Sequence, residues 1–392
     1  EGGMSSFQAV ATAIAAQVGT GNIVGSAGAI LTGGPGAIFW MWVIAFFGMA
    51  TIYAEATLAQ ETRIKAKDGT IHGGPVYYIT TAFKGGFGKF LAGFFAIAII
   101  LALGCFGCMV QSNSIGSTIH TAFGIPSWTV GVVLVIICGF IFLGGVDRLA
   151  SVTEKIVPIM AGFFLLGALI VLIIRIKYVP ATFGMIFKYA FEPQAIIGGG
   201  LGTALKIAIS QGAKRGLFSN EAGMGSTPHA HAVAKVDHPV EQGFVAMTGV
   251  FIDTFVVLNL TALVILTTKS IPSGKTGAEL SQYAFSTLYG KGGNIFIAIC
   301  MFFFAFSTII GWYFFGQANV KYLFGPKAVK IYSVLAAVCV FLGSLAEVDL
   351  VWNMADCFNS LMVIPNILAL FALSKVISQV HKDYFKNFNK AK

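Results

Sequence analysis

The chain has 392 residues, of which 56% are hydrophobic and only 10% charged, and its mean hydropathy is +0.82. Soluble domains carry about 25% charged residues, so this composition excludes a soluble globular protein and predicts one membrane domain. Lys and Arg exceed Asp and Glu by 25 to 16, but in a membrane protein such an excess reports orientation, and no basic stretch interleaved with aromatic residues points to a nucleic-acid partner.

Hydropathy predicts ten apolar segments, because about 20 residues are needed to cross the bilayer core. In chain order they are 5–31, 36–62, 87–123, 127–143, 151–176, 194–234, 240–266, 294–324, 327–345 and 350–373. Two shorter stretches, 181–191 and 278–288, are predicted to be helices at the membrane surface. We expect a single transporter-sized domain, with repeat one at 5–176, repeat two at 194–373 and a basic cytoplasmic tail at 374–392.

The distribution of Lys and Arg predicts the orientation, because these residues favour cytoplasmic loops. If the first segment starts inside, the cytoplasmic side collects 16 of them and the outside 6, and three more lie inside the sixth segment. The bias favours ten crossings that start and end in the cytoplasm.

Two segments are interrupted by glycine and polar residues at the depth of the membrane centre. The first contains Val18-Gly19-Thr20-Gly21-Asn22, and the sixth contains the run from Gly216 to Gly225. They are five helices apart, and an odd number of helices per repeat inverts the second half relative to the first. This plan is typical of secondary transporters, among which the LeuT transporter is the established example.

Such breaks predict a binding site, because irregular backbone in a bilayer is tolerated only where it is buried in protein or lines a cavity. Amides of Thr20, Gly21 and Asn22 can hold a carboxylate. Carbonyls of Ala15, Ala16 and Val18, with the Asn22 side chain, are candidate cation ligands. A zwitterionic amino acid together with sodium satisfies both groups, and because no acid lies between Glu1 and Glu55, the substrate is expected to bring its own negative charge.

Three motifs resemble the alanine or glycine:cation symporter family over essentially the whole chain. They are Gln17 to Asn22, the run Gly-Gly-Pro-Gly-Ala-Ile-Phe-Trp-Met-Trp at 33–42, and Ser-Asn-Glu-Ala-Gly-Met-Gly-Ser-Thr-Pro at 219–228. The resemblance implies an all-α membrane protein of the LeuT type, with a 5+5 inverted repeat and discontinuous helices 1 and 6. It also implies sodium-coupled uptake of alanine and glycine across the cell membrane, no organic cofactor and no enzymatic activity. Family members have an additional N-terminal helix, which we expect this sequence to lack.

The resemblance also assigns residues to the site. One sodium ion would be held by Ala15, Val18, Ser307 and Thr308, and a second sodium site would involve Gln17 and Asn22. Substrate would meet Thr20, Gly21, Asn22, Gln111, Phe218, Ser219, Asn220, Thr308 and Trp312. Bulky rings around this pocket predict small substrates, because overpacking is unfavourable.

Four acids fall within apolar segments, where charge is unfavourable unless it faces a partner or cavity. For Glu55 the sequence favours solvation at the cytoplasmic interface. Glu221 is expected to pair with Lys214 or Arg215, either as a gate or, as we favour, as structural support. Asp253 and Asp356 could bind protons or hold helices together. His229 and His231 are expected to face a loop rather than a metal, and Cys105 and Cys108 to pack as small apolar residues.

Three other functions remain open at this stage. Proton coupling through Asp253 or Asp356 would replace sodium. A channel would need a continuous polar stripe, whereas these helices carry isolated polar residues. A membrane-embedded enzyme could use His229, Glu221 and Cys357, but no motif joins them.

Overall fold

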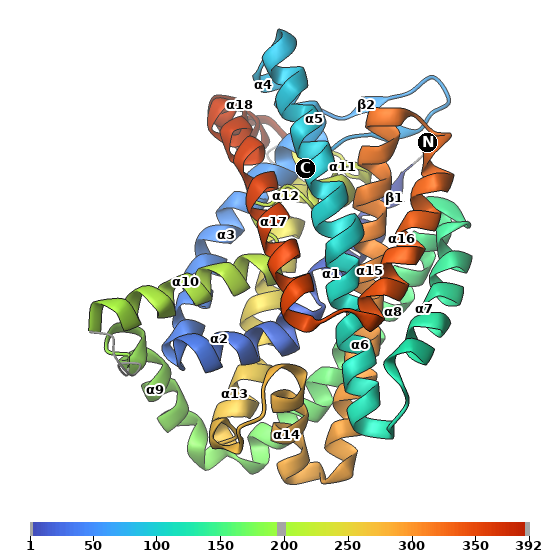
Figure 1. The fold of residues 1–392 in the computed structure, drawn as a ribbon. Coiled ribbons are helices and arrows are strands. Elements are labelled where there is room, and N and C mark those ends of the chain that lie inside the picture. The colour runs from blue at the N-terminus through green and yellow to red at the C-terminus, as the bar shows by residue number, and fades with distance from the viewer. Residues whose placement is uncertain (1–2, 194–200, 389–392) are drawn as a thin grey trace.

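The computed structural model describes residues 3–193 and 201–388, and the described chain is almost entirely helical (Figure 1). The helices of the first half are α1 (Ser6–Gln17), η1 (Gly21–Gly25), α2 (Ser26–Gly33), α3 (Gly36–Glu61), α4 (Pro75–Ala82), α5 (Gly85–Leu101), η2 (Ala102–Gly107), α6 (Cys108–Phe123), α7 (Ser127–Phe142), α8 (Gly145–Ile174), η3 (Ile176–Tyr178) and α9 (Val179–Phe191). Those of the second half are α10 (Leu201–Asn220), α11 (Pro228–Ala232), α12 (Pro239–Val250), η4 (Phe251–Leu258), α13 (Asn259–Thr267), η5 (Ile271–Ser273), α14 (Gly277–Tyr289), α15 (Lys291–Phe324), α16 (Ala328–Leu345), α17 (Val348–Ala372), α18 (Ser374–Asp383) and η6 (Tyr384–Phe388).

Most predicted segments correspond to long apolar helices. Among the described residues, seven helices are long and apolar enough to cross a membrane, and the bent pair of α1 with η1–α2 makes an eighth. The fourth predicted segment is the shorter apolar helix α7. The sixth falls on α10, which carries three cationic residues and then breaks, and the part of this segment at 194–200 lies outside the described residues, as do 389–392 of the predicted tail. The count of ten crossings and the repeat boundaries therefore stay predictions.

Local sequence explains where several helices begin and end. The side chain of Ser5 accepts from the Gln8 amide, and the Gln8 side chain accepts from the Ser5 amide, which closes a capping box at the start of α1. Proline stands in the first turn of α4, α9, α11 and α12, where its missing N–H is not needed. Gly124 ends α6 in the left-handed region with φ of 69°. Pro158 and Pro365 lie inside α8 and α17.

Two short strand pairs fasten the end of the molecule that carries the N-terminus. The strands β1 (Met4–Ser5) and β4 (Ala234–Lys235) pair in parallel, which ties the start of α1 to the segment after α11. The strands β2 (Ile64–Lys65) and β3 (Ile71–His72) form an antiparallel hairpin. Figure 1 shows β2, α4 and α18 at this end, and α9, α13 and α14 at the other.

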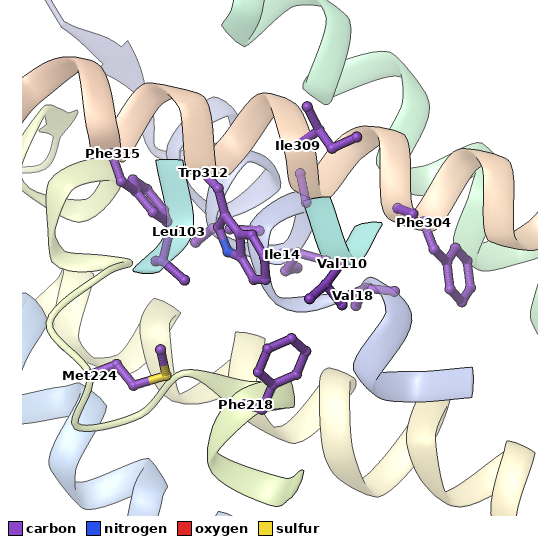
Figure 2. Close-up of a cluster of buried hydrophobic side chains, with 14 of the residues drawn as sticks. Ile14, Val18, Leu103, Val110, Phe218, Met224, Phe304, Ile309, Trp312 and Phe315 are labelled. Carbon is purple, nitrogen blue, oxygen red and sulfur yellow. The ribbon is translucent and has the colours of Figure 1, made fainter. Parts of the chain in front are cut away.

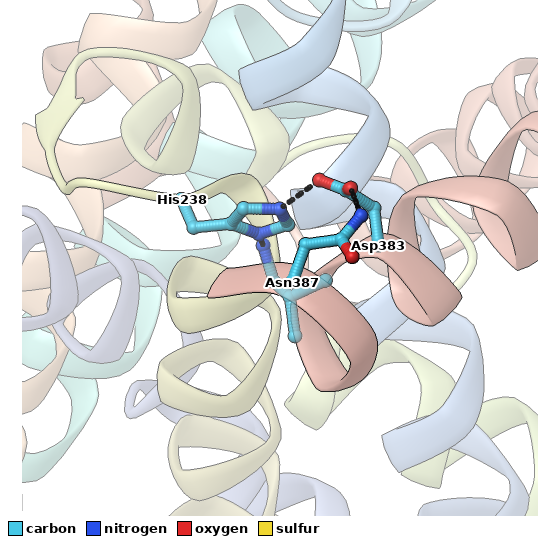
Figure 3. Close-up of polar contacts among 4 residues, drawn as sticks. His238, Asp383 and Asn387 are labelled. Carbon is cyan, nitrogen blue, oxygen red and sulfur yellow. Dashed lines mark hydrogen bonds and ion pairs between the residues drawn. The ribbon is translucent and has the colours of Figure 1, made fainter. Parts of the chain in front are cut away.

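The C-terminal helix α18 docks on the same end through polar contacts. The Nε2 atom of His238, just before α12, lies 3.3 Å from Asp383 Oδ2, and Asn387 donates to Asp383 Oδ1 at 2.7 Å (Figure 3). The hydroxyl of Tyr53 on α3 lies 2.7 Å from His381 Nδ1. No residue of α18 is fully buried, so these polar contacts act together with the partly buried Val376 and Ile377, which pack against the core.

The distribution of side chains is the reverse of that in a soluble protein. Large apolar residues are exposed on α5, α7, α8, α16 and α17, where they can face lipid. Conversely, many polar side chains are fully buried along α1, α6, η4 and α15. Buried polar side chains also follow both interrupted helices, between residues 12 and 26 and between residues 219 and 231, which places the candidate site there.

Candidate binding site at the two helix breaks

The two predicted breaks are present and lie against each other. Helix α1 ends at Gln17, and the chain resumes as η1 at Gly21 with a bend of 46°. Helix α10 ends at Asn220, and α11 begins only at Pro228. A Cβ atom on Gly21 would lie 3.1 Å from the Cα atom of Ser219, so glycine is what lets the two breaks approach this closely.

Oxygen atoms from α1 and α15 converge beside the first break. The Thr308 hydroxyl donates to the carbonyl of Ala15 at 2.8 Å and lies 3.1 Å from that of Val18. The Ser307 hydroxyl lies 3.4 Å from the Ala15 carbonyl and 2.9 Å from that of Phe304 in its own helix. All four predicted sodium ligands are buried together in one place. Two carbonyls and two hydroxyls are oxygen ligands of the kind that hard cations prefer.

Gln111 of α6 forms hydrogen bonds with both the backbone and the side chain of Thr20 at the first break. Its Oε1 atom accepts from the Thr20 amide at 3.1 Å, and its Nε2 atom donates to the Thr20 hydroxyl at 3.1 Å. The Thr20 amide, predicted to hold a substrate carboxylate, therefore has a protein acceptor in this structure.

The Asn22 side chain connects the first break to η4. Its Oδ1 atom accepts from the Gly19 amide at 2.9 Å. Its Nδ2 atom donates to the backbone oxygen and to Oδ1 of Asp253, at 3.0 and 2.9 Å. The Asn22 amide itself donates to the Gly19 carbonyl at 3.2 Å. Asn22 thus stabilises the conformation of the break, in addition to being a candidate ligand.

Asp253 is fully buried among neutral donors. Its Oδ2 atom accepts from the hydroxyls of Ser219 at 2.8 Å and Thr254 at 3.1 Å, in addition to the bonds from Asn22 at Oδ1 and the backbone oxygen. No Lys or Arg among the described residues forms an ion pair with it. From the sequence, Asp253 could either bind protons or hold helices together. In the structure it accepts hydrogen bonds from both Asn22 and Ser219, so it connects the two breaks.

Gln17 and Asn22, predicted together for a second sodium site, have different partners. The Gln17 side chain donates to the Asn220 carbonyl at 2.9 Å, while its Oε1 atom is buried with no hydrogen-bond partner. Asn22 is engaged with Gly19 and Asp253, as described above. The side chain of Asn220 accepts from the Ala222 amide at 3.0 Å and so stabilises the second break.

Aromatic rings close the space between the breaks. The Phe218 ring meets the Trp312 indole edge to face, with centroids 5.8 Å apart, and Figure 2 shows the two rings facing each other near Val18. On its other side Phe218 packs on Trp352 at 4.7 Å, and Arg215 stacks over the Trp352 ring at 4.5 Å. Trp352 was not predicted as a site residue, because no sequence pattern in α17 indicates which of its faces packs against Phe218.

The prediction that Glu55 is solvated at the interface is wrong. Glu55 is fully buried and accepts from the amides of Gly223 and Gly225, both at 2.9 Å, and from the Asn366 side chain at 2.6 Å. The hydroxyl of Tyr78 donates in turn to Asn366. A helix break exposes backbone N–H groups that need acceptors, and this requirement was the signal that could have identified Glu55.

The predicted pairing of Glu221 with Lys214 or Arg215 is also wrong. Both cations pair with Asp356 of α17, at 2.8 and 3.5 Å, so Asp356 holds two helices together. Glu221 accepts instead from the Trp312 indole N–H at 2.6 Å and from the Ser226 hydroxyl. The chain turns sharply at Glu221, which aims the carboxylate away from the cations that precede it in sequence.

His229 and His231 are buried in α11 and do not face a loop, contrary to the prediction. His229 Nδ1 lies 2.6 Å from the Ser226 carbonyl, and Nε2 lies 2.8 Å from the Asn319 amide nitrogen. His231 Nδ1 lies 2.7 Å from the Gln242 amide nitrogen. Among the described residues, no three His, Cys, Asp or Glu side chains are grouped so as to hold a metal ion. Cys108 donates to the Leu103 carbonyl at 3.2 Å, in keeping with a packing role.

The model of a family described as the sodium:alanine symporter family matches residues 1–392. The chain belongs to the sodium:alanine symporter family. Family members and structural neighbours are transporters, not enzymes, and this member is a multi-pass protein of the cell membrane.

Two relatives show the range of names within the family. The sodium/alanine symporter AgcS of Methanococcus maripaludis is 43% identical over 99% of this chain and 87% of its own length. A protein of Bacillus subtilis named probable sodium/glutamine symporter GlnT is 41% identical over 97% of this chain and 78% of its own length.

Solved structures confirm the predicted fold class. The structure of MhsT in complex with L-phenylalanine superposes with a TM-score of 0.67 at 14% identity, covering 95% of this chain and 89% of that one. The symporter therefore has the LeuT-type fold, with discontinuous first and sixth helices.

Proposed function

We propose that this family member takes up small neutral amino acids, principally alanine and glycine, into the cell together with sodium by alternating access. The observation that carries the proposal is the convergence of two hydroxyls on two carbonyls. The Thr308 hydroxyl lies 2.8 and 3.1 Å from the carbonyls of Ala15 and Val18, and the Ser307 hydroxyl lies 3.4 Å from that of Ala15. Sodium bound there would join α1 to α15 across the first break, so ion occupancy and the geometry of the break would be linked.

The substrate carboxylate is proposed to bind at the amides of Thr20, Gly21 and Asn22. The Thr20 amide now donates to Gln111, so a bound carboxylate would replace Gln111 as its acceptor. Because Gln111 also donates to the Thr20 hydroxyl, its amide can rotate and remain bonded to the break. This exchange would leave no buried amide without a partner.

The substrate ammonium is proposed to bind the carbonyls of Phe218 and Ser219 at the end of α10. The Asn220 carbonyl in the same turn already accepts from Gln17. The Phe218 ring contacts Trp312 on one side and Trp352 on the other, and we expect these bulky rings to admit a methyl group but not a branched side chain. This supports alanine and glycine over larger amino acids.

Uptake of radiolabelled alanine into proteoliposomes tests the proposal. An inward sodium gradient should drive accumulation, and dissipating the gradient with a sodium ionophore should abolish it. Asn22→Ala should weaken alanine binding or sodium dependence at least tenfold, because it removes both the Gly19 and the Asp253 contact. Uptake that ignores the sodium gradient would reject the coupling.

Proton coupling is the second candidate, and Asp253 is the observation that favours it, since this buried carboxylate meets only neutral donors among the described residues. The two candidates differ in one experiment. A proton gradient without sodium should drive no alanine uptake if sodium is the coupling ion. Sodium-free, proton-driven uptake that is lost in Asp253→Asn would establish the alternative.

A further inference from the structure

Glu221 combines two unfavourable features at the start of the second break. Its backbone lies in the left-handed region with φ of 58°, one of only two non-glycine residues in the described chain to do so. Glycine is the residue that usually ends a helix in this conformation, because a side chain makes it strained. The side chain is moreover a fully buried carboxylate, and no described Lys or Arg forms an ion pair with it.

The contacts of the carboxylate account for its presence. Oε1 accepts from the indole N–H of Trp312 at 2.6 Å, and Oε2 accepts from the hydroxyl of Ser226. Ser226 closes the far end of the same break, so one side chain joins both ends of the interrupted segment to α15.

Trp312 is fixed on three sides as a result. The N–H bond to Glu221 sets the rotation of the indole in its plane. The six-membered ring lies against η2, where a Cβ on Gly107 would be 2.6 Å from its Cζ3 atom. The Phe218 ring meets the indole at 87° with centroids 5.8 Å apart.

From these contacts we infer that Glu221 is a positioning residue for substrate size: it holds Trp312 against Phe218 and so sets the volume left for the substrate side chain. The inference rests on the proposed function, since Trp312 and Phe218 bound the proposed pocket. Glu221 acts through Trp312 and does not itself touch the substrate. Without its acceptor the indole N–H would be buried without a partner, and the ring would turn to find one.

The variant Glu221→Gly tests the loss of the carboxylate acceptor without adding backbone strain, because glycine adopts the left-handed conformation readily. In proteoliposomes it should raise the KM for alanine about tenfold, with Vmax per folded protein within twofold of wild type. The ratio of 2-aminobutyrate or valine uptake to alanine uptake should be at least five times higher in this variant than in wild type. Glu221→Gln keeps an acceptor of the same shape and should restore wild-type discrimination.

A double-variant cycle tests whether the effect passes through Trp312. Trp312→Phe removes the donor, so Glu221→Gly with Trp312→Phe should be no worse than the poorer single variant. Trp352→Phe is the matched comparison, because Trp352 packs on the other side of Phe218 and has no bond to Glu221. The effects of Trp352→Phe and Glu221→Gly on the KM for alanine should multiply in the double variant.

The outcomes separate this inference from the proposed function. If wild-type protein shows no sodium-driven alanine uptake, the proposed function fails, and the same cycle is run on whichever neutral amino acid the protein carries. If Glu221→Gly folds and keeps the wild-type KM and discrimination, or if its effect multiplies with that of Trp312→Phe, the inference is overturned. Should Glu221→Gly fail to fold, Trp312→Phe with wild-type discrimination would overturn it equally.

Discussion

The side chain of Asn22 donates to both the backbone oxygen and the carboxylate of Asp253, at 3.0 and 2.9 Å, although the two residues lie 231 positions apart. One belongs to the break of the first helix and the other to a π-helical turn in the seventh predicted segment. Because Asp253 also accepts from Ser219 at the second break, this pair couples the two breaks. A movement of either broken helix must strain or exchange these bonds.

Thr308→Val is expected to raise the sodium concentration for half-maximal alanine uptake at least tenfold, equivalent to about 1.4 kcal/mol. The change keeps the shape of the side chain and removes the hydroxyl that contacts Ala15 and Val18. Thr118→Val is the matched control, since that buried hydroxyl bonds only to carbonyls of its own helix. A sodium titration of uptake measures both, and an unchanged value for Thr308→Val would remove the sodium site from α15.

Gly19→Ala is expected to reduce alanine uptake to below a tenth of wild type. Its Cβ atom would lie 2.4 Å from Thr308 Oγ1 and 2.9 Å from Gln111 Oε1, so both neighbours would have to move. Gly28→Ala, nine residues along the same broken helix, would meet nothing within 4 Å and should transport normally. Equal uptake by the two variants would show that the space beside Gly19 is not needed.

Glu55→Gln is expected to destabilise the folded protein by about 3 kcal/mol, because an amide group cannot replace both carboxylate oxygens toward three N–H donors. The melting temperature in detergent should fall by about 5 °C or more. Glu61→Gln, an exposed residue at the end of the same helix, should leave it unchanged. A Glu55 variant as stable as wild type would mean that the second break satisfies its amides without α3.

The docking of α18 should depend on pH through Asp383. Hydrogen bonds from Asn387 and His238 hold the pKa of the Asp383 carboxyl below its ordinary value of 3.8. A lowered pKa in the folded state means that the contact is fully formed above pH 3.8 and is lost as the pH falls through the lower folded value. Acidification from pH 7 to 5 therefore should not release α18 through this residue.

Asp383→Asn should loosen α18 already at neutral pH. A spin label at the exposed position Ser378 reports this as a narrower electron paramagnetic resonance line. Wild type should approach the line shape of the variant only below pH 3.8. Identical line shapes for wild type and variant at pH 7 would assign the docking to Tyr53 and His381 instead.

The periodic and compositional parts of the structure could be predicted from the sequence. The apolar segments, the two broken helices and the grouping of Ala15, Val18, Ser307 and Thr308 follow from glycine placement, from hydropathy and from the family motifs. Partners of buried charges could not be predicted in the same way. Lys214 and Arg215 precede Glu221 in sequence, yet they pair with Asp356 of α17, which only the tertiary structure brings beside them.

By itself the sequence determined that the chain crosses a membrane, that its first and sixth helices are interrupted, and to which family it belongs. These properties depend on residues close together along the chain, where hydrophobicity and backbone freedom act locally. Only the tertiary structure decided what Glu55, Glu221, Asp253 and His229 do, since each finds its partner on another helix. In a medium without water, a buried polar group is satisfied by whatever donor or acceptor the packing of helices brings to it, and no local pattern records that choice.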